Sequence, residues 1–378
     1  MEFEFLSPVD NTLLAHNLML PEQVLGRNLR IHTHQDGFPE LNDVKVAIVT
    51  LDYKTNKGES LHFRFRQQFY QLFYGNWDFA CADLGVLYPG ERHEDTLFAI
   101  QTLVRSLYQR NILLILIGGE QENTLGLFRG LSNLDTYVNL TTIDSHFDFG
   151  TPGVLVSDDS YMSKIITEKP NNLKQFTNLG YQSYHVSQEE LDLMQKLFFD
   201  AYRLGDITAA MEDVEPIFRD TDILSVDCKA IKAAEMDNSN GNPNGFDGAQ
   251  ICKLMRYAGL SDRLGVLGVF PSSSSYRADQ LLAQMVWYVF EGFCFRVNEY
   301  PFSTHESCTK FVVPMEHETL TFFKSTKSQR WWIEVPKEEK HNKTWQTTLL
   351  PCAENDYRLA QKGEIPSRWW KSMHRNMH

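Results

Sequence analysis

The sequence lacks a long apolar run, a paired cysteine motif and a net positive charge, and each absence excludes a class of protein. No apolar stretch reaches the roughly 20 residues that a membrane-spanning helix needs. Residues 1–17 lack the basic start and the apolar run of a signal peptide. The six cysteines contain no Cys-x-x-Cys pair and no regular spacing, which is typical of reduced thiols. We therefore expect a cytoplasmic protein without a membrane span.

The charge of the chain is acidic and unevenly distributed. A net charge of −13 argues against nucleic acid as a partner. Residues 324–378 are nevertheless basic, because they contain eleven Lys and Arg against six Asp and Glu. With 378 residues, 42% of them hydrophobic, the chain can bury a large core. These features predict one large domain that carries extensions of different composition.

Short apolar runs alternate with segments of helical periodicity through the centre of the chain. The expected strands are Val44–Leu51, Asn111–Ile117, Val138–Ile143, Asp222–Val226 and Leu264–Phe270. The expected helices are His93–Arg110, Ser187–Tyr202, Asp247–Tyr257 and Arg277–Phe295. Such alternation indicates a mostly parallel sheet covered on both faces, which is a three-layer α/β/α fold. In these sheets functional residues collect at the carboxyl ends of the strands.

An acidic segment with one histidine follows the third expected strand. Asp144, His146 and Asp148 occupy alternate positions, so an extended backbone would turn their side chains to the same side. Carboxylates together with an imidazole suit manganese, iron or zinc. In isolation such a pattern is usually no more than polar residues at a strand end, so the surrounding sequence decides its meaning.

Four blocks, in a fixed order, give this segment a family resemblance. They are Leu114–Gln121 (LILIGGEQ), Thr142–Asp148 (TIDSHFD), Leu224–Lys229 (LSVDCK) and Leu264–Pro271 (LGVLGVFP). Together they resemble the ureohydrolases (arginase, agmatinase and formimidoylglutamase), whose blocks read Gly-Gly-Asp-His, Asp-x-His-x-Asp, Ser-x-Asp-x-Asp and Glu-x-x-Pro. One block alone is a weak signal, but four in order favour an arginase-like fold over about residues 40–300.

The resemblance implies a site in which two histidines and four aspartates hold two manganese ions. The retained ligand positions are Asp144, His146, Asp148 and Asp227. The first histidine of the pattern is replaced by Gln121, and the last aspartate is replaced by Lys229. Each expected ion therefore lacks one of its ligands.

Two further positions of the family's site have changed. The histidine that the family uses as a proton shuttle corresponds to Tyr161, and the glutamate that recognises a guanidinium group corresponds to Gly268. A tyrosine is more often a packing residue than an acid, since its reference pKa is about 10. If the site is catalytic, Asp148 and Tyr161 are the side chains expected to take part.

These replacements change what the site can do. In a two-metal site, water between the cations is acidified to hydroxide, which attacks the guanidine carbon. Lys229 instead brings positive charge to a place where the pattern has a cation, unless its side chain points into solvent. We expect either a lysine-bridged site without metal or one divalent ion, manganese or zinc, on Asp144, His146 and Asp227. A two-metal cluster is not expected.

Segments at both ends lie outside the family's blocks. We expect an N-terminal extension (1–41), an arginase-like domain (42–302) and a Trp-rich basic C-terminal extension (303–378). Because tryptophan and arginine are enriched at binding hot spots, the extension is a candidate docking surface for a protein partner. The tryptophans concerned are Trp331, Trp332, Trp369 and Trp370. The alternative is a β-rich appendage whose tryptophans cover the main domain.

Two functions remain open at this point. The first is an inactive ureohydrolase-fold protein that serves as a structural or interaction module, and the joint change of ligand, shuttle and substrate positions favours it. The second is an active metal-dependent hydrolase of linear C–N bonds in amidines, guanidines or formimidoylglutamate, in which Tyr161 polarises a carbonyl. The resemblance is also compatible with a homo-oligomer, since members of the family often form trimers or hexamers.

Overall fold

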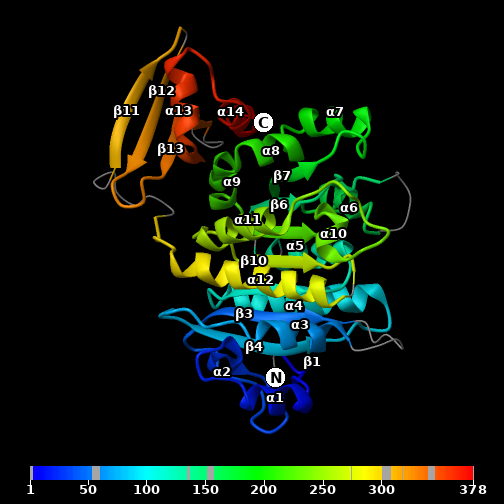
Figure 1. Ribbon diagram of the computed structural model, residues 1–378. Coiled ribbons are helices and arrows are strands. Elements are labelled where there is room, and N and C mark those ends of the chain that lie inside the picture. Colours follow the sequence, from blue (N-terminus) through cyan, green and yellow to red (C-terminus); the bar gives the residue numbers. More distant parts are fainter. Residues whose placement is uncertain are drawn as a thin grey trace.

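A mostly parallel sheet of ten strands forms the centre of the molecule (Figure 1). A computed structural model describes residues 3–52, 60–132, 134, 137–150, 157–273, 275–299, 308–316, 318–338 and 345–377. The strands are β1 (Leu6–Ser7), β2 (Arg30–Ile31), β3 (Val44–Leu51), β4 (Ala80–Leu87), β5 (Leu113–Ile117), β6 (Val138–Ile143), β7 (Leu173–Tyr181), β8 (Asp200–Arg203), β9 (Ile223–Asp227) and β10 (Val266–Phe270). Their order is β1-β4-β3-β5-β10-β9-β6-β7-β8, with β2 also paired to β4. Among these pairs β1–β4 is antiparallel and the others are parallel.

Helices cover both faces of this sheet, which confirms the predicted three layers. One face carries α3 (Leu61–Phe69), α8 (Leu204–Ala209), α9 (Glu215–Arg219), α11 (Gly248–Leu260) and α12 (Tyr276–Cys294). The other carries α4 (His93–Tyr108), α5 (Thr124–Ser132), α6 (Tyr161–Thr167) and α7 (Gln188–Lys196). Short connecting elements are α1 (Asn11–Leu18), α2 (Leu25–Asn28), α10 (Ala233–Met236) and the 3₁₀ turns η1 (Gln121–Asn123), η2 (Met211–Val214) and η3 (Cys228–Ala230). No helix in the described ranges is long and apolar enough to cross a membrane.

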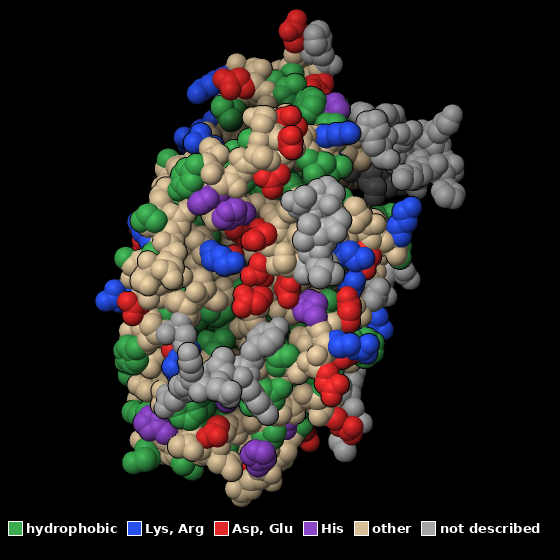
Figure 2. Space-filling view, turned by 90° about the vertical axis from the view of Figure 1, so that its right-hand side faces the viewer, with side chains coloured by type: hydrophobic (Ala, Val, Ile, Leu, Met, Phe, Trp, Pro, Cys, Tyr) green, Lys and Arg blue, Asp and Glu red, His purple; other side chains and the backbone are tan. Residues whose placement is uncertain are grey.

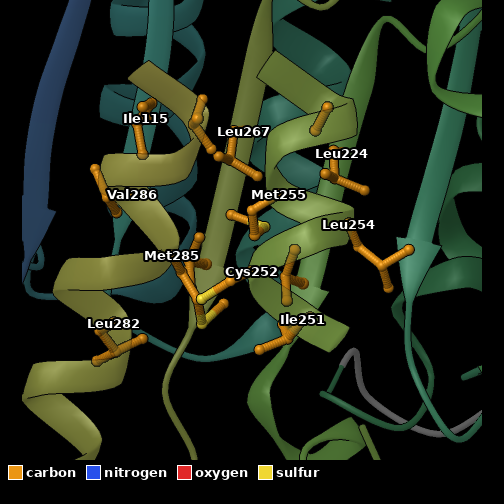
Figure 3. Packing of buried hydrophobic residues seen from close by; sticks show 14 of the residues in the cluster. Ile115, Leu224, Ile251, Cys252, Leu254, Met255, Leu267, Leu282, Met285 and Val286 are labelled. Atoms are coloured by element: carbon orange, nitrogen blue, oxygen red, sulfur yellow. The ribbon is translucent and has the colours of Figure 1, made fainter. Parts of the chain in front are cut away.

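Each face of the sheet has its own hydrophobic core. In β5, Ile115 belongs to the core under α11 and α12, whereas Leu114 and Leu116 belong to the core on the opposite face. Successive side chains of a strand point to opposite sides, so an uninterrupted apolar run serves both cores at once. Figure 3 shows the first core, where Ile115 and other strand residues face Met255 of α11 and Met285 of α12.

The predicted elements agree with the structure except near one helix end. β3 and β6 have the predicted bounds, and β5, β9 and β10 lie within two residues of theirs. The sequence did not indicate β4 or β7. The helix expected at Ser187–Tyr202 is wrong in its last part, because α7 ends at Lys196 and Asp200–Arg203 forms β8. Phe198 there has a φ of 55°, and a left-handed residue cannot continue a right-handed helix.

The N-terminal and C-terminal segments differ in how they attach. Within residues 1–41, β1 and β2 both pair with β4, so this segment continues the main sheet. The C-terminal part forms a separate antiparallel sheet of β11 (Cys308–Pro314), β12 (Thr319–Ser325), β13 (Trp331–Glu338) and β14 (Trp345–Cys352), followed by α13 (Glu354–Gln361) and α14 (Ser367–Met377). The predicted boundary between residues 302 and 303 falls outside the described residues. In Figure 1 the added sheet lies on the side opposite to the carboxyl ends of the main strands.

The C-terminal extension is held against the main domain by cationic side chains. Arg219 of α9 donates to the carbonyl oxygens of Trp331 (3.0 Å) and Cys352 (2.9 Å). In the other direction, Lys371 of α14 lies 2.9 Å from a carboxylate oxygen of Asp200. The basic composition of the extension is thus used in part for contacts within the chain.

Burial of the tryptophans contradicts most of the predicted docking surface. Trp331, Trp332 and Trp369 are only 6%, 2% and 2% exposed. The ring of Trp332 packs against the guanidinium of Arg219, 4.7 Å from the ring centre. These three side chains are enclosed by the chain itself: Trp331 and Trp369 belong to the hydrophobic core of the extension, and Trp332 packs against the main domain. Trp370, at 44% exposed, still faces solvent.

Candidate functional site

The carboxyl ends of β5, β6 and β9 bring the predicted site residues to one edge of the sheet. β10 lies between β5 and β9, and β9 pairs with β6, so the segments that follow these strands are neighbours. Figure 2 faces this edge and shows acidic side chains gathered in the middle of it, with Lys or Arg and His side chains beside them. The position agrees with the rule that sites of parallel sheets form at the strands' carboxyl ends.

The loop after β6 is held in one conformation by its own polar groups. Asp144, only 1% exposed, accepts a hydrogen bond from the backbone N–H of His146 (2.9 Å). Asn178 of β7 donates to the carbonyl oxygen of His146 at 2.7 Å. Asp148 has a φ of 56°, which turns the chain after the acidic segment and leaves its carboxylate buried. The two aspartates therefore face the interior of the site.

The imidazole of His146 lies at the exposed side of these carboxylates. Its side chain is 41% exposed, and its Nδ1 lies 3.8 Å from Asp144 Oδ1 and 2.9 Å from the hydroxyl of Ser145. The ring lies 4.5 Å from the ring of His185, which in turn contacts the Asn242 amide at 2.7 Å. Sequence reasoning missed His185, because β7, which positions it, was not predicted. The histidine pair forms a rim beside the carboxylates.

Lys229 forms the cationic centre of the site. Its backbone N–H donates to Asp227 Oδ1 (2.7 Å), and its ammonium nitrogen lies 3.8 Å from Asp227 Oδ2. The same nitrogen lies 3.3 Å from Asp158 Oδ2. Burial alone would lower the pKa of Lys229, but these two carboxylates raise it, so the side chain stays charged. The lysine therefore connects two acidic groups that would otherwise repel each other.

Asp158 is a second residue that sequence reasoning did not identify. Its Oδ1 accepts a hydrogen bond from the backbone N–H of Glu122 (3.1 Å), while its Oδ2 contacts Lys229. Burial and the charge of Asp158 raise the pKa of Glu120. Asp158 thus joins the loops that follow β5, β6 and β9. Its only signal in the sequence was its place three residues before Tyr161.

Crowding of the carboxylates changes their protonation. Burial, and next the charge of Asp144, raises the pKa of Asp148 well above its usual value, and the same two causes act in that order on Asp227. Burial and the charge of Asp148 likewise raise the pKa of Tyr161, which is fully buried. Tyr161 is therefore a neutral phenol over a wide range of pH, and it is not an acid that releases protons near neutrality.

The two remaining predicted positions contribute no charge to the site. Gln121 begins η1 and is buried, and its Nε2 has no hydrogen-bond partner among the described residues. Gly268 lies within β10, two residues before the strand ends. A Cβ at Gly268 would lie 2.7 Å from Leu127 and 2.8 Å from the Phe270 ring, so hydrophobic groups occupy this position.

The residues present do not fit a two-metal centre. Within the ranges that the structure describes, no three His, Cys, Asp or Glu side chains are arranged to hold a metal ion. An ammonium and an amide stand at two of the six ligand positions, and His146 is turned toward His185. One observation favours a bound cation instead: the buried Oδ2 of Asp144 has no hydrogen-bond partner in the described part of the chain.

Comparisons with known proteins agree with the fold. The chain is similar to the formiminoglutamase of Trypanosoma cruzi solved with Mn2+2, at 17% identity and a TM-score of 0.60, over 68% of this chain and 96% of that one. It is similar to the formimidoylglutamase of Bacillus subtilis subsp. subtilis str. 168, at 12% identity and a TM-score of 0.59, over 69% and 91%. It also resembles the agmatine ureohydrolase of Thermoplasma volcanium, at 16% identity and a TM-score of 0.54, over 70% and 94%.

At these identities the solved structures establish the fold alone, and the sequence has no significant match among curated proteins. The model of the Arginase family matches residues 57–269, which is more than half of the chain. This span includes the loops after β5, β6 and β9 and almost all of β10. The chain therefore belongs to the Arginase family.

Proposed function

We propose that this member of the Arginase family does not hydrolyse guanidino or amidine bonds and serves as a structural or interaction module. The observation that carries the proposal is the ammonium of Lys229, 3.3 Å from Asp158 and 3.8 Å from Asp227. A fixed positive charge there balances the acidic groups and repels a divalent cation. Such a site does not activate water, because metal ions produce the hydroxide in the family's reaction.

The other changed positions support the same conclusion. Tyr161 is a buried neutral phenol where the family's pattern has a proton-carrying histidine. Leu127 and Phe270 fill the space next to Gly268, where the pattern has a substrate-binding glutamate. Two of the six ligand positions, the proton-transfer position and the substrate position thus carry residues of different chemistry, which supports the absence of hydrolysis.

The competing function is a hydrolase of linear C–N bonds with one metal ion. It is favoured by the buried Asp144 Oδ2, which is free to accept a ligand within the described part of the chain. Asp144 and Asp227, with His146 after rotation of its ring, would be the groups that hold such an ion, and the ion would supply Lewis-acid chemistry. The experiment below separates the two functions.

The test measures Mn²⁺ binding by titration calorimetry and elemental analysis, together with hydrolysis of arginine, agmatine and N-formimidoylglutamate. We expect the natural chain to bind no stoichiometric Mn²⁺ and to hydrolyse none of them. The double variant Gln121→His/Lys229→Asp restores both ligands, and we expect it to bind Mn²⁺. Lys253→Asp, which alters an exposed lysine paired with Glu212, is the matched control and should bind none. One or more ions per natural chain, together with hydrolysis, would refute the proposal.

A further inference from the structure

A pocket at the outer edge of the main sheet lies outside the acidic site and is lined by different residues. It has a volume of about 520 Å³, within the range of about 300–1,000 Å³ that is usual for small-molecule sites. The N-terminal segment, the chain before β3 and the residue Arg110 after α4 form it. Its lining residues are Phe3, Glu4, Leu6, His32, Phe38, Pro39, Leu41 and Arg110.

The walls of the pocket are mainly flat and apolar. The rings of Phe3 and Phe38 are stacked with centres 4.9 Å apart, and the His32 ring meets Phe38 edge-on at 5.2 Å. Leu6 and Leu41 complete the apolar lining. The charged residues Glu4 and Arg110 are exposed and so lie on the solvent side of the pocket. Such walls fit a planar aromatic molecule, because aromatic rings gain from stacked and edge-to-face contacts.

One buried polar group defines the orientation of a ligand. His32 is 8% exposed, and its Nδ1 lies 3.1 Å from the carbonyl oxygen of Leu84. A carbonyl oxygen can only accept, so Nδ1 carries a proton, and in the tautomer protonated at Nδ1 the Nε2 atom is an acceptor. Nε2 makes no hydrogen bond to another described residue. His32 thus offers a buried acceptor within an apolar, aromatic wall, whereas the Glu4 carboxylate lies on the solvent side.

We propose that this pocket binds a small, uncharged aromatic molecule that carries one hydrogen-bond donor such as a hydroxyl group. The aromatic ring packs against Phe38, and the hydroxyl donates to Nε2 of His32. Recognition is independent of the acidic edge of the sheet, so the pocket functions whether or not the site there is catalytic.

The probes are phenol, which has the donor, and anisole, which lacks it. Titrated into the full-length protein and followed by ligand-detected NMR, phenol should bind saturably and about 2- to 10-fold more tightly than anisole, the effect of one hydrogen bond between neutral groups. His32→Asn keeps a donor toward Leu84 but removes the second ring nitrogen. It should abolish the preference, because phenol loses its hydrogen bond as well as the ring contact, whereas anisole loses the ring contact alone.

Phe38→Ala removes the stacked wall and should weaken both probes about 10-fold. The matched control is Phe98→Ala, since Phe98 is 69% exposed on α4 and does not line the pocket. A melting curve verifies that each variant is folded, and Leu41→Ala replaces Phe38→Ala if the latter is not. The proposal is overturned if phenol does not saturate the natural chain, if His32→Asn keeps the preference, or if the wall variant binds as tightly as the control.

Discussion

Two residues, Lys229 and Gln121, differ from the family's pattern in charge and in ligand atoms. Gln121 begins the 3₁₀ turn after β5, and Lys229 lies in the 3₁₀ turn after β9. Replacement of a carboxylate by an ammonium changes the local charge by two units, and the ammonium lies within 4 Å of two carboxylates although the side chain is 47% exposed. We therefore expect a lower affinity for a divalent cation at this site.

A second cation, Arg66, is completely buried beside the main sheet. Its guanidinium donates two hydrogen bonds to the carboxylate of Asp83, at 2.8 and 2.7 Å. It also donates to the hydroxyl of Thr50 and to the carbonyl oxygen of Gly85, and Tyr70 donates to Asp83. Burial alone would lower the pKa of Arg66, but the charge of Asp83 raises it, so the guanidinium remains charged. α3, β3 and β4 are joined through these groups.

We expect Arg66→Met to lower the free energy of unfolding by about 3–5 kcal/mol, because Asp83 would be left as an unpaired buried charge. Urea denaturation followed by circular dichroism measures the change. The double variant Arg66→Met/Asp83→Leu should recover part of the loss, since it removes the orphaned charge. Arg358→Met, which breaks an exposed pair with Glu354, should change stability by less than about 1 kcal/mol. Equal effects at both arginines would contradict this account.

At the scale of elements, α9 is the support on which the C-terminal sheet rests. Arg219 at its last turn reaches the backbone of both β13 and β14 and packs on the Trp332 ring. Glu215, one turn earlier, lies 3.0 Å from Arg219 and 3.3 Å from Arg330 of the extension. One short helix thus supplies both a cation and an anion to the same junction, so the added sheet has a defined position.

Arg219→Met should weaken this junction, because two buried carbonyl oxygens lose their donor. Each lost hydrogen bond should lower the free energy of unfolding by about 1–3 kcal/mol. Chemical unfolding followed by tryptophan fluorescence should show a lower midpoint and earlier exposure of the tryptophans. Arg219→Lys should recover only part of the stability, since an ammonium cannot reach both carbonyls with a planar fork. An unchanged midpoint for Arg219→Met, matching that of Lys253→Met on the exposed side of α11, would show that the extension is held by other contacts.

At the scale of the whole molecule, the basic extension and the acidic main domain complement each other. The net charge of −13 conceals a cationic C-terminal segment, and Arg330 and Lys371 in it face Glu215 and Asp200 of the main domain. These pairs are mostly buried, so solvent screens them less than surface pairs. Association of the two parts is consequently a property of the chain and does not require a partner.

We expect a chain that ends at Glu299 to be less stable than the complete chain, with a lower melting temperature and stronger binding of a hydrophobic dye. The reason is that Asp200 and Glu215 lose their cations, and α9 loses the apolar cover provided by Trp332. Melting curves of the two chains, recorded at the same concentration and ionic strength, provide the comparison. Equal melting temperatures would indicate that the extension is attached without stabilising the main domain.

The sequence predicted the central strands well because they are buried on both faces. β3 and β6 consist mostly of apolar or β-branched residues, interrupted by Lys45 and Asn139, and a short run of this composition favours a strand. β8 was mistaken for the end of a helix, since Asp200–Arg203 has no apolar alternation and the turn before it depends on the conformation of Phe198. The acidic positions at the ends of β6 and β9 were also predicted, because each directly follows its strand.

By itself the sequence determined the parallel sheet, the meeting of Asp144, Asp148 and Asp227 at one edge, and the replacements at Gln121 and Lys229. These follow from strand periodicity and from the order of the blocks, which are local properties of the chain. Only the tertiary structure decided that Asp158 pairs with Lys229, that His146 turns toward His185, and that the tryptophans of the extension are buried. Each of these depends on contacts between segments far apart in the chain, and no local pattern specifies which of several charged or aromatic neighbours a side chain will meet.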